Sequence, residues 1–145
     1  MRALVQRVTQ AWVNIDGEET GRIGQGLLVF LAIMQDDTQE QLRKMVNKVA
    51  DLRIFPDAEG KMNRSVQETG KAVLVVSQFT LAAQLHKGNQ PSFFAAAAPS
   101  IAEASVNAFC EGLRQKKLTV AEGRFGADMQ VHLVNDGPVT LWLDL

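Results

Sequence analysis

This chain of 145 residues has few of the groups on which enzymes most often rely. It has one cysteine, so no internal disulfide can form, and a reducing, cytoplasmic location is the expectation. It has two histidines, but no His-x-x-x-His spacing, and a zinc site needs three or four cysteine or histidine ligands. The sequence therefore predicts no metal site and no cofactor.

Long apolar runs and an excess of positive charge are also missing. The longest apolar stretch, residues 27–34, is far shorter than the ~20 residues that span a bilayer. The net charge is −1, from 15 basic and 16 acidic residues, whereas a protein that wraps a nucleic acid duplex is usually strongly basic. We therefore expect no membrane partner, no DNA partner, and only a small, local contact with RNA.

The residues that are present indicate one mixed domain, residues 1–145. Hydrophobic residues make up 46% of the chain, close to the average for globular proteins. Residues 3–15 alternate between apolar and polar, Asp16-Gly17 is a hairpin signal, and residues 18–23 form a return strand. The continuous apolar stretch 27–34 is typical of a central strand covered on both faces, and a further strand is predicted over 72–78.

Two helices are predicted. Thr38 and Gln41 have the spacing of a capping box, and the helix that follows should end near residue 53. The second helix opens at Pro99-Ser100, with Ser100 and Glu103 as another capping box. Its predicted inner face consists of Ala104, Ala108, Phe109 and Leu113. Because strands outnumber helices, the predicted class is mixed α/β, rich in strands, with two main helices packed on a curved mixed sheet or partial β-barrel.

Two apolar runs end in polar clusters where a strand should simply continue. Residues 73–76 lead into Ser77-Gln78-Phe79-Thr80, and residues 131–134 lead into Asn135-Asp136-Gly137-Pro138. Proline has no amide hydrogen, so Pro138 between two strand segments marks a sharp turn or an exposed edge. The first cluster offers hydrogen-bond donors, and the second offers unpaired carbonyl acceptors.

These clusters resemble the two signature motifs of the D-aminoacyl-tRNA deacylase family, of the D-tyrosyl-tRNA deacylase type. The motifs are Ser-Gln-Phe-Thr, here residues 77–80, and Asn-x-Gly-Pro-Val-Thr, here residues 135–140. The resemblance extends to residues 3–8, 53–55, 59–63 and 123–129. One departure is Gln90, where the family leads us to expect an arginine before the proline; Lys87 is the nearby cation that would compensate.

The resemblance implies a homodimer that hydrolyses the ester of D-aminoacyl-tRNA at the 3′ acceptor end. In the family the Gly-Pro dipeptide is cis and reaches from the partner subunit into the active site, where it excludes L-amino acids. Here that dipeptide is Gly137-Pro138. Paired carbonyls could accept hydrogen bonds from the α-ammonium group and leave no room for an L side chain. Glycine has no side chain, so tRNA mischarged with glycine could also be a substrate.

We expect the backbone amides around Phe79 and Thr80 to carry the chemistry by binding the ester carbonyl. Ser77 and Gln78 would fix the strand end and the terminal adenosine, with water as the attacking group. Phe79 in the core and Thr80 as an ordinary strand residue are the structural alternatives. For Met129, core packing competes with a role in substrate binding.

Other functions are also compatible with the sequence. A small-ester hydrolase would use Thr80 or Ser77 covalently, although no adjacent general base can be identified. A Ser-His-Asp device would need His86 or His132 beside one of the hydroxyl groups, but the glycine pattern of a nucleophile elbow is absent. A non-enzymatic RNA-binding domain is disfavoured by the near-neutral charge and by the lack of an aromatic stacking patch.

Overall fold

The computed structural model, which describes residues 1–86 and 88–145, is organised around β1 (Arg2–Ile15). Along β1, alternate side chains such as Ala3, Val5 and Val13 are fully buried, as the alternating pattern predicts. Asp16 and Gly17 both have positive φ and turn the chain into β2 (Glu18–Ile23). The predicted hairpin is therefore confirmed, because Asp-Gly supplies the two left-handed residues that a tight hairpin turn needs.

The sheet is mixed and curved. Its order is β2-β1-β3-β6-β7, where β3 is Gly26–Ala32, β6 is Ala72–Ser77 and β7 is Val120–Glu122. β1 is antiparallel to β2 and β3, whereas β3, β6 and β7 run parallel. Curvature brings the two ends of this order together, since a Cβ at Gly21 would lie only 2.7 Å from the Glu122 carbonyl oxygen. The predicted curved, strand-rich α/β sheet with a barrel-like shape is thus confirmed.

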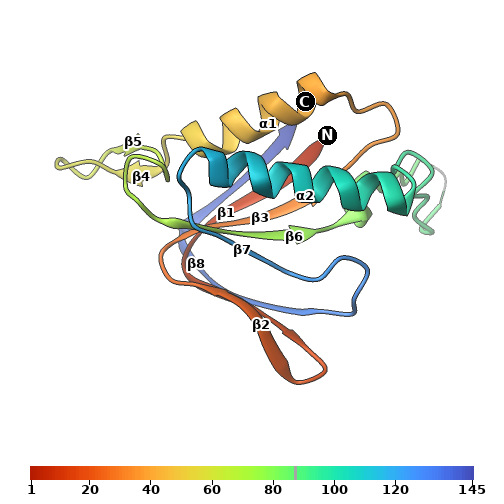
Figure 1. The fold of residues 1–145 in the computed structure, drawn as a ribbon, viewed down its shortest axis with the longest axis horizontal. Coiled ribbons are helices and arrows are strands. Elements are labelled where there is room, and N and C mark those ends of the chain that lie inside the picture. The colour runs from red at the N-terminus through yellow and green to blue at the C-terminus, as the bar shows by residue number, and fades with distance from the viewer. Residues whose placement is uncertain (87) are drawn as a thin grey trace.

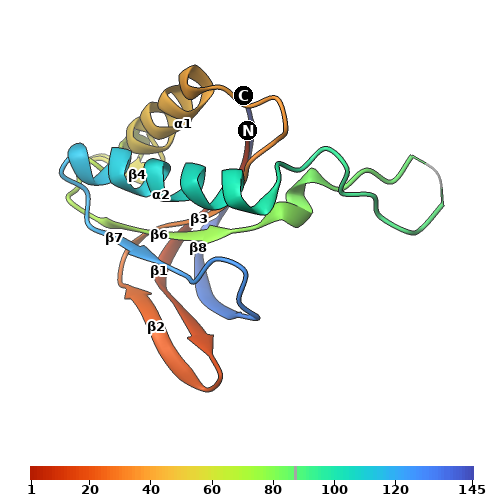
Figure 2. The same ribbon diagram turned by 45° about the vertical axis from the view of Figure 1, so that its right-hand side comes forward.

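The two predicted helices cover one face of this sheet, and the β1–β2 hairpin lies on its other side (Figure 2). α1 (Gln39–Asp51) begins with the predicted capping box between Thr38 and Gln41. α2 (Pro99–Gln115) begins with Pro99 in its first turn, and its N-cap is Ala98, which makes no side-chain cap. The predicted Ser100–Glu103 capping box is therefore wrong, because Ser100 already lies inside the helix.

The inner face of α2 also differs in part from the prediction. Phe109 and Leu113 are fully buried as expected, but Ala104 and Ala108 are exposed. The remaining buried positions are Ala102, Val106 and Cys110. Because large side chains decide which face turns inward, the helix is rotated toward Val106 and Phe109. Cys110 is fully buried in this face, where it packs as a small apolar residue, and burial raises the pKa of its thiol.

β3 lies at the centre of the molecule and is covered on both faces. Leu27, Val29 and Leu31 pack toward the helices, and Leu28 packs with the residues of β1, β2 and β6 on the other face. All four are fully buried, which confirms the prediction made for the apolar stretch. Short elements complete the fold: β4 (Phe55–Pro56) pairs with β5 (Met62–Arg64), and η1, a 3-10 turn (Phe79–Ala82), follows β6. Figure 1 shows β4 and β5 at one end of the sheet and the loop before α2 at the other.

The last strand differs from its prediction. Residues Gln130–Asp144 form one strand, β8, rather than two strands separated by a turn. Its register against β1 passes from Val8 opposite Asn135 to Gln6 opposite Thr140, so residues 136–139 bulge opposite Arg7. Among the described strands, β8 pairs with β1 alone, so the alternative interpretation of Pro138, as part of an exposed edge, is correct. No helix in the described residues is long and apolar enough to cross a membrane.

Candidate active site

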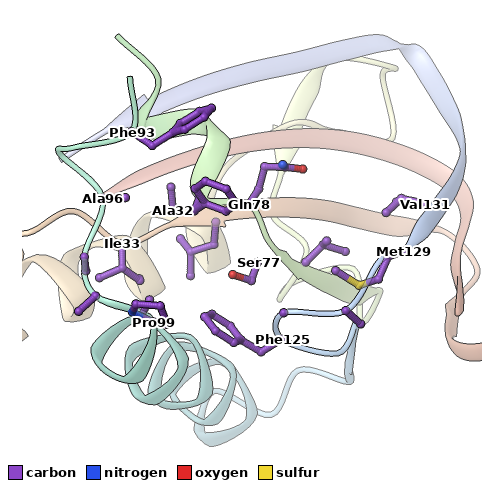
Figure 3. A pocket seen from close by; sticks show the side chains of 18 residues that line it. Ala32, Ile33, Ser77, Gln78, Phe93, Ala96, Pro99, Phe125, Met129 and Val131 are labelled. Carbon is purple, nitrogen blue, oxygen red and sulfur yellow. The ribbon is translucent and has the colours of Figure 1, made fainter. Parts of the chain in front are cut away.

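A cavity of about 670 Å³ lies where β6 ends, beside the first turn of α2. Its walls come from the ends of β3 and β6, the segment before α2, the turn after β7 and the start of β8. In Figure 3, Ser77 lies near the centre of the view, with Ile33 and Pro99 on one side and Met129 on the other. The cavity therefore opens at the C-terminal end of a buried parallel strand, where α/β sheets often place their ligand sites.

The Ser77–Thr80 motif forms the bend where β6 stops. The Gln78 amide donates to the Leu31 carbonyl oxygen at 2.8 Å, the last bond in line with β3, and the chain then turns into η1. In the described part of the chain, the amides of Phe79 and Thr80 donate to no acceptor. The first amides of a helical turn are free by geometry, so they form a ready site for negative charge.

The side chains of this motif point to different surroundings. Ser77 and Gln78 line the cavity, and the Gln78 Nε2 donates to the Thr80 hydroxyl oxygen at 2.5 Å. Thr80 is exposed and lies in η1, so its interpretation as an ordinary strand residue is wrong. Phe79 is 56% exposed and meets Phe93 edge to face, with ring centroids 5.1 Å apart. The alternative that Phe79 belongs to the core is therefore also wrong.

Met129 both packs in the core and lines the cavity, the two alternatives considered for it. Its half-buried side chain packs against the apolar cluster beneath β8 and also lines the cavity. A Cβ at Gly123 would lie 2.7 Å from the Met129 sulfur, so a glycine at that position leaves room for the methionine. Core packing and contact with a ligand are thus compatible for this residue.

The structure does not bring Gly137 and Pro138 into the cavity of their own chain. Both are exposed on the bulge of β8, and neither is among the lining residues. The peptide bond between them is cis. The Asn135 side chain closes the bulge, since its Oδ1 accepts from the Val139 amide at 2.8 Å and its Nδ2 donates to the Thr140 hydroxyl at 2.9 Å.

Arg7 holds the same bulge from β1. Its Nε donates to the Asp136 carbonyl oxygen at 3.1 Å, and its Nη1 donates to the Ile54 carbonyl oxygen at 2.5 Å. No sequence pattern predicts a role for Arg7, although it lies in one of the stretches that carry the family resemblance. Only the register of β1 against β8 shows that it faces the Gly-Pro segment.

Among the described residues that line the cavity, none has an ionisable side chain that could act as an acid or a base. His132 lies elsewhere, stacked on Trp12 with ring centroids 4.7 Å apart, and its Nε2 is 3.5 Å from the Asn14 Nδ2. His86 is also absent from the lining, so the structure does not support a Ser-His-Asp device. Among the described residues, no group of three or more His, Cys, Asp or Glu is placed to hold a metal ion.

Other lining residues were not predicted from the sequence. Phe93, Phe125 and the alanine-rich segment before α2 all contribute to the apolar wall. Apolar residues in loops give no periodic signal, so only the fold identifies them as a wall. Gln90 is exposed and does not line the cavity, and Lys87, proposed to compensate for it, lies outside the described residues.

Comparison with known proteins gives one consistent result. The family model described as D-Tyr-tRNA(Tyr) deacylase matches residues 4–144. A D-aminoacyl-tRNA deacylase of Magnetococcus marinus is 57% identical over 146 residues, covering 100% of this chain and 97% of the relative. A protein of the same name from Escherichia coli strain K12 / DH10B is 54% identical over 145 residues, covering 100% of both chains.

Two solved structures are similar along their full length. A structure titled c-Myc DNA Unwinding Element Binding Protein has a TM-score of 0.94 and 46% identity, with 100% of this chain and 99% of that chain covered. A probable eukaryotic D-amino acid tRNA deacylase has a TM-score of 0.85, with 99% and 98% covered. At 22% identity, this second likeness shows the fold alone.

Proposed function

Because this chain belongs to the D-Tyr-tRNA(Tyr) deacylase family and hydrolyses D-aminoacyl-tRNA, we propose that the ester is cleaved in the cavity at the end of β6. The observation that carries this proposal is the pair of backbone amides at Phe79, which lines the cavity, and at Thr80, the next residue, both without an acceptor in the described chain. None of the described residues that line this cavity is ionisable. Such a site can stabilise negative charge, although it has no acid or base of its own.

The proposed chemistry is attack by water on the ester carbonyl carbon. The Phe79 and Thr80 amides donate to the carbonyl oxygen as it becomes an oxyanion, and donors placed in this way supply several kcal/mol of transition-state stabilisation. The bond between the acyl carbon and the ribose oxygen then breaks. One proton of the water passes to that ribose oxygen, with the neighbouring ribose hydroxyl as the relay, so free amino acid and tRNA leave.

Ser77, Gln78 and Met129 are proposed to bind the substrate. Ser77 and Gln78 offer hydroxyl and amide groups at the strand end, where the terminal adenosine would lie. Met129 and the apolar wall accept the body of the substrate. An unbranched thioether adapts to different shapes, which suits a site that handles more than one amino acid.

Chirality is proposed to be read by Gly137 and Pro138 of a partner subunit in a homodimer. Both residues are exposed and lie outside the cavity of their own chain, so only a second copy would bring them to a substrate. The edge strand β8 supports such an interface, because it pairs on one side only and carries Val134 and Trp142, which are 45% and 50% exposed. A two-fold dimer would then have two equivalent sites.

The other candidate mechanism uses the Thr80 hydroxyl as a covalent nucleophile. The structure offers it little support, since the hydroxyl accepts a hydrogen bond from Gln78 and no base lines the cavity. The proposed D-aminoacyl-tRNA deacylase acts in the cytoplasm. Glycine attached to tRNA is a further proposed substrate, because a site that excludes L side chains does not reject an amino acid that has no side chain.

The experiment that tests this function compares loss of the ester from D-aminoacyl-tRNA and L-aminoacyl-tRNA with the same tRNA and amino acid. We expect fast loss of the D ester alone. Equal loss of both esters would contradict the chirality proposal. Sedimentation under the same conditions should give a dimer, and an active monomer would contradict the shared site.

A further inference from the structure

Several basic side chains without an acidic partner lie in the stretch of the chain from α1 to the start of β6, although Lys116, Lys117 and Arg124 also have no ion pair in the described residues. Within residues 1–86 and 88–145, no carboxylate forms an ion pair with the following members of this stretch: Arg43, Lys48, Arg53, Arg64 and Lys71. By contrast, Arg2, Arg7, Arg22 and Arg114 all pair with an acid. We call Lys48, Arg53 and Arg64 the basic cluster.

Two shallow hollows meet at Arg53, and Arg64 of the cluster lines neither of them. Lys48 and Arg53 line a hollow of about 570 Å³ on the outer side of α1, and Arg53 also lines a second hollow of about 380 Å³. Glu68 lines the second hollow and lies close enough to Arg53 and Arg64 to feel both charges. Arg64 lies next to the second hollow, because its Nη2 donates to the Glu68 carbonyl oxygen at 3.0 Å. The three cations are therefore neighbours along the surface and do not all line one hollow.

Few free carboxylates oppose these cations. Asp51 lines both hollows without an ion-pair partner in the described chain. The Glu68 carboxylate accepts from the Ser65 amide at 2.7 Å, and this hydrogen bond lowers the pKa of the carboxyl group, so its charge is retained. The three cations thus lie beside two acidic side chains, Asp51 and Glu68, although the whole chain has a net charge of −1.

The chemistry of the cluster suits a chain of phosphates. Arginine presents a planar fork of donors that matches phosphate oxygens, and lysine adds a mobile point charge. The Arg53 Nε is occupied by the Asn63 carbonyl oxygen at 3.0 Å, which orients the guanidinium and leaves its other nitrogens available. An extended, open row of cations fits a phosphodiester backbone better than it fits a single small anion.

The cluster is tied to the Gly-Pro segment. Arg53 precedes Ile54, and the Arg7 guanidinium joins the Ile54 carbonyl oxygen to the Asp136 carbonyl oxygen, one residue before Gly137. The cavity of the same chain lies at the other end of the sheet, beside the first turn of α2 (Figure 1). Wherever Gly137 reaches into a partner's cavity, the basic cluster therefore lies beside that partner's cavity rather than its own.

We propose that Lys48, Arg53 and Arg64 of one subunit bind the phosphate backbone of the aminoacyl-tRNA whose ester is cleaved in the other subunit. This inference rests on the proposed function, because it needs the shared site. The near-neutral charge of the chain predicts a small RNA contact, and the proposal places that contact on the basic cluster. The subunit that supplies Gly137 and Pro138 to a site would then also bind the RNA at that site.

The first test uses two substrates that share the ester but differ in the RNA. Wild type and Lys48→Gln/Arg53→Gln are compared on D-aminoacyl-tRNA and on the same D-amino acid esterified to adenosine. We expect KM for the tRNA to rise on the order of tenfold and the slope of log KM against log salt to fall by about one per lost contact. Hydrolysis of the adenosine ester should not change. The matched control is Arg22→Gln, which removes one cation from the β1–β2 hairpin and should leave KM for the tRNA as in wild type.

Equal losses on both substrates, or no change on the tRNA, would overturn the RNA contact. These results differ from failure of the function itself, in which wild type would hydrolyse neither D ester, and which would overturn both proposals.

The second test asks which subunit supplies the cluster. A Lys48→Gln/Arg53→Gln subunit is co-purified, through two different tags, with an Ala127→Trp subunit whose cavity is filled and whose own homodimer is inactive. If the cluster serves the partner, the only working cavity in this heterodimer lies beside an intact cluster. Its KM for D-aminoacyl-tRNA should then match wild type. A KM as high as that of the Lys48→Gln/Arg53→Gln homodimer would show that each cluster serves its own cavity and would overturn the assignment.

Discussion

Arg7 holds Asp136 by two contacts at once: its Nε lies 3.1 Å from the Asp136 carbonyl oxygen and 3.3 Å from the Asp136 Oδ2. The Arg7 side chain is only 12% exposed, and a second donor of the same guanidinium is bonded to the Ile54 carbonyl oxygen. One side chain therefore fixes the segment that leads into Gly137 against both β1 and the chain before β4. Lysine cannot reproduce this arrangement, because it has one nitrogen rather than a fork.

We predict that Arg7→Lys loses activity through misplacement of the Gly137 segment. Loss of two hydrogen bonds should lower the free energy of unfolding by about 1–3 kcal/mol. Hydrolysis of D-aminoacyl-tRNA should fall, and the ratio of D to L hydrolysis should fall with it. Arg114→Lys is the control, since Arg114 also bonds a carboxylate and a carbonyl but lies away from the bulge. An unchanged D to L ratio in folded Arg7→Lys would remove this positioning role.

Gly137→Ala should damage the site through steric crowding. A Cβ at this position would lie 2.7 Å from the Val139 Cγ2 and 3.0 Å from the Val139 amide nitrogen, and φ is +136°. We expect D-ester hydrolysis to fall at least tenfold, since a shift of about 1 Å in a positioning group can cost 10²-fold. Gly17→Ala is the control, because Gly17 has φ of +80° but open space around it. Stopped-time assays and melting curves of both variants separate crowding from backbone strain; equal activity in the two would contradict the prediction.

Thr80→Ala should keep substantial activity if backbone amides and water perform the reaction. Removing the hydroxyl deletes the hydrogen bond from Gln78 but leaves the Phe79 and Thr80 amides in place. We expect kcat to stay within about tenfold of wild type, whereas removal of a covalent nucleophile costs several orders of magnitude. Single-turnover kinetics with saturating enzyme measure the chemical step. Loss of nearly all activity in a folded variant with normal binding would favour covalent threonine.

The pH profile of kcat should show no inflection that comes from the titration of an enzyme side chain. Because no described residue that lines the cavity is ionisable, a bell-shaped profile from an enzyme acid and base is not expected between about pH 5 and 9. Any inflection should follow the α-amino group of the substrate and move when the amino acid is changed. A profile that instead moves in His86→Gln or His132→Gln would identify a catalytic histidine.

Asp37→Asn should destabilise the fold much more than a comparable surface change. The Asp37 carboxylate is paired with the Met1 ammonium group, both are at least nine-tenths buried, and the Met34 amide donates to Asp37 Oδ2 at 2.7 Å. Breaking a buried pair from one side costs about 3–5 kcal/mol. Asp144→Asn, in an exposed pair with Arg2 at 3.3 Å, should cost less than about 1 kcal/mol. Urea unfolding of the two variants checks the difference, and similar midpoints would contradict it.

Much of the fold follows from local sequence patterns. The hairpin at Asp16-Gly17, the capping box at Thr38 and the doubly covered strand β3 all depend on residues close together in the chain, so periodicity and turn chemistry predict them. The errors arise where the decision is not local. Ser100 has a good capping spacing, but Pro99 starts the helix one residue earlier, and the bulge of β8 depends on the register against β1.

The candidate site also has features that the local sequence predicts and others that depend on the fold. The Ser77–Thr80 motif is visible in the sequence through its resemblance to a family, but its 3-10 turn and its free amides are properties of the backbone alone. Phe125 and Phe93 are brought together by segments far apart in the chain, so no spacing rule finds them. Arg7 is similar, because its partners Ile54 and Asp136 lie 47 and 129 residues away.

If the ester is cleaved in the cavity as proposed, the lack of ionisable side chains among its described lining residues also determines how this enzyme would respond to inhibitors. Electrophiles that label serine and cysteine hydrolases need a nucleophile activated by a neighbouring base, and Ser77 has none in the cavity. Cys110, the single thiol, is fully buried. Activity-based profiling with such reagents should therefore not label this hydrolase. Useful inhibitors would be reversible, apolar mimics of the acylated adenosine that accept hydrogen bonds from the Phe79 and Thr80 amides.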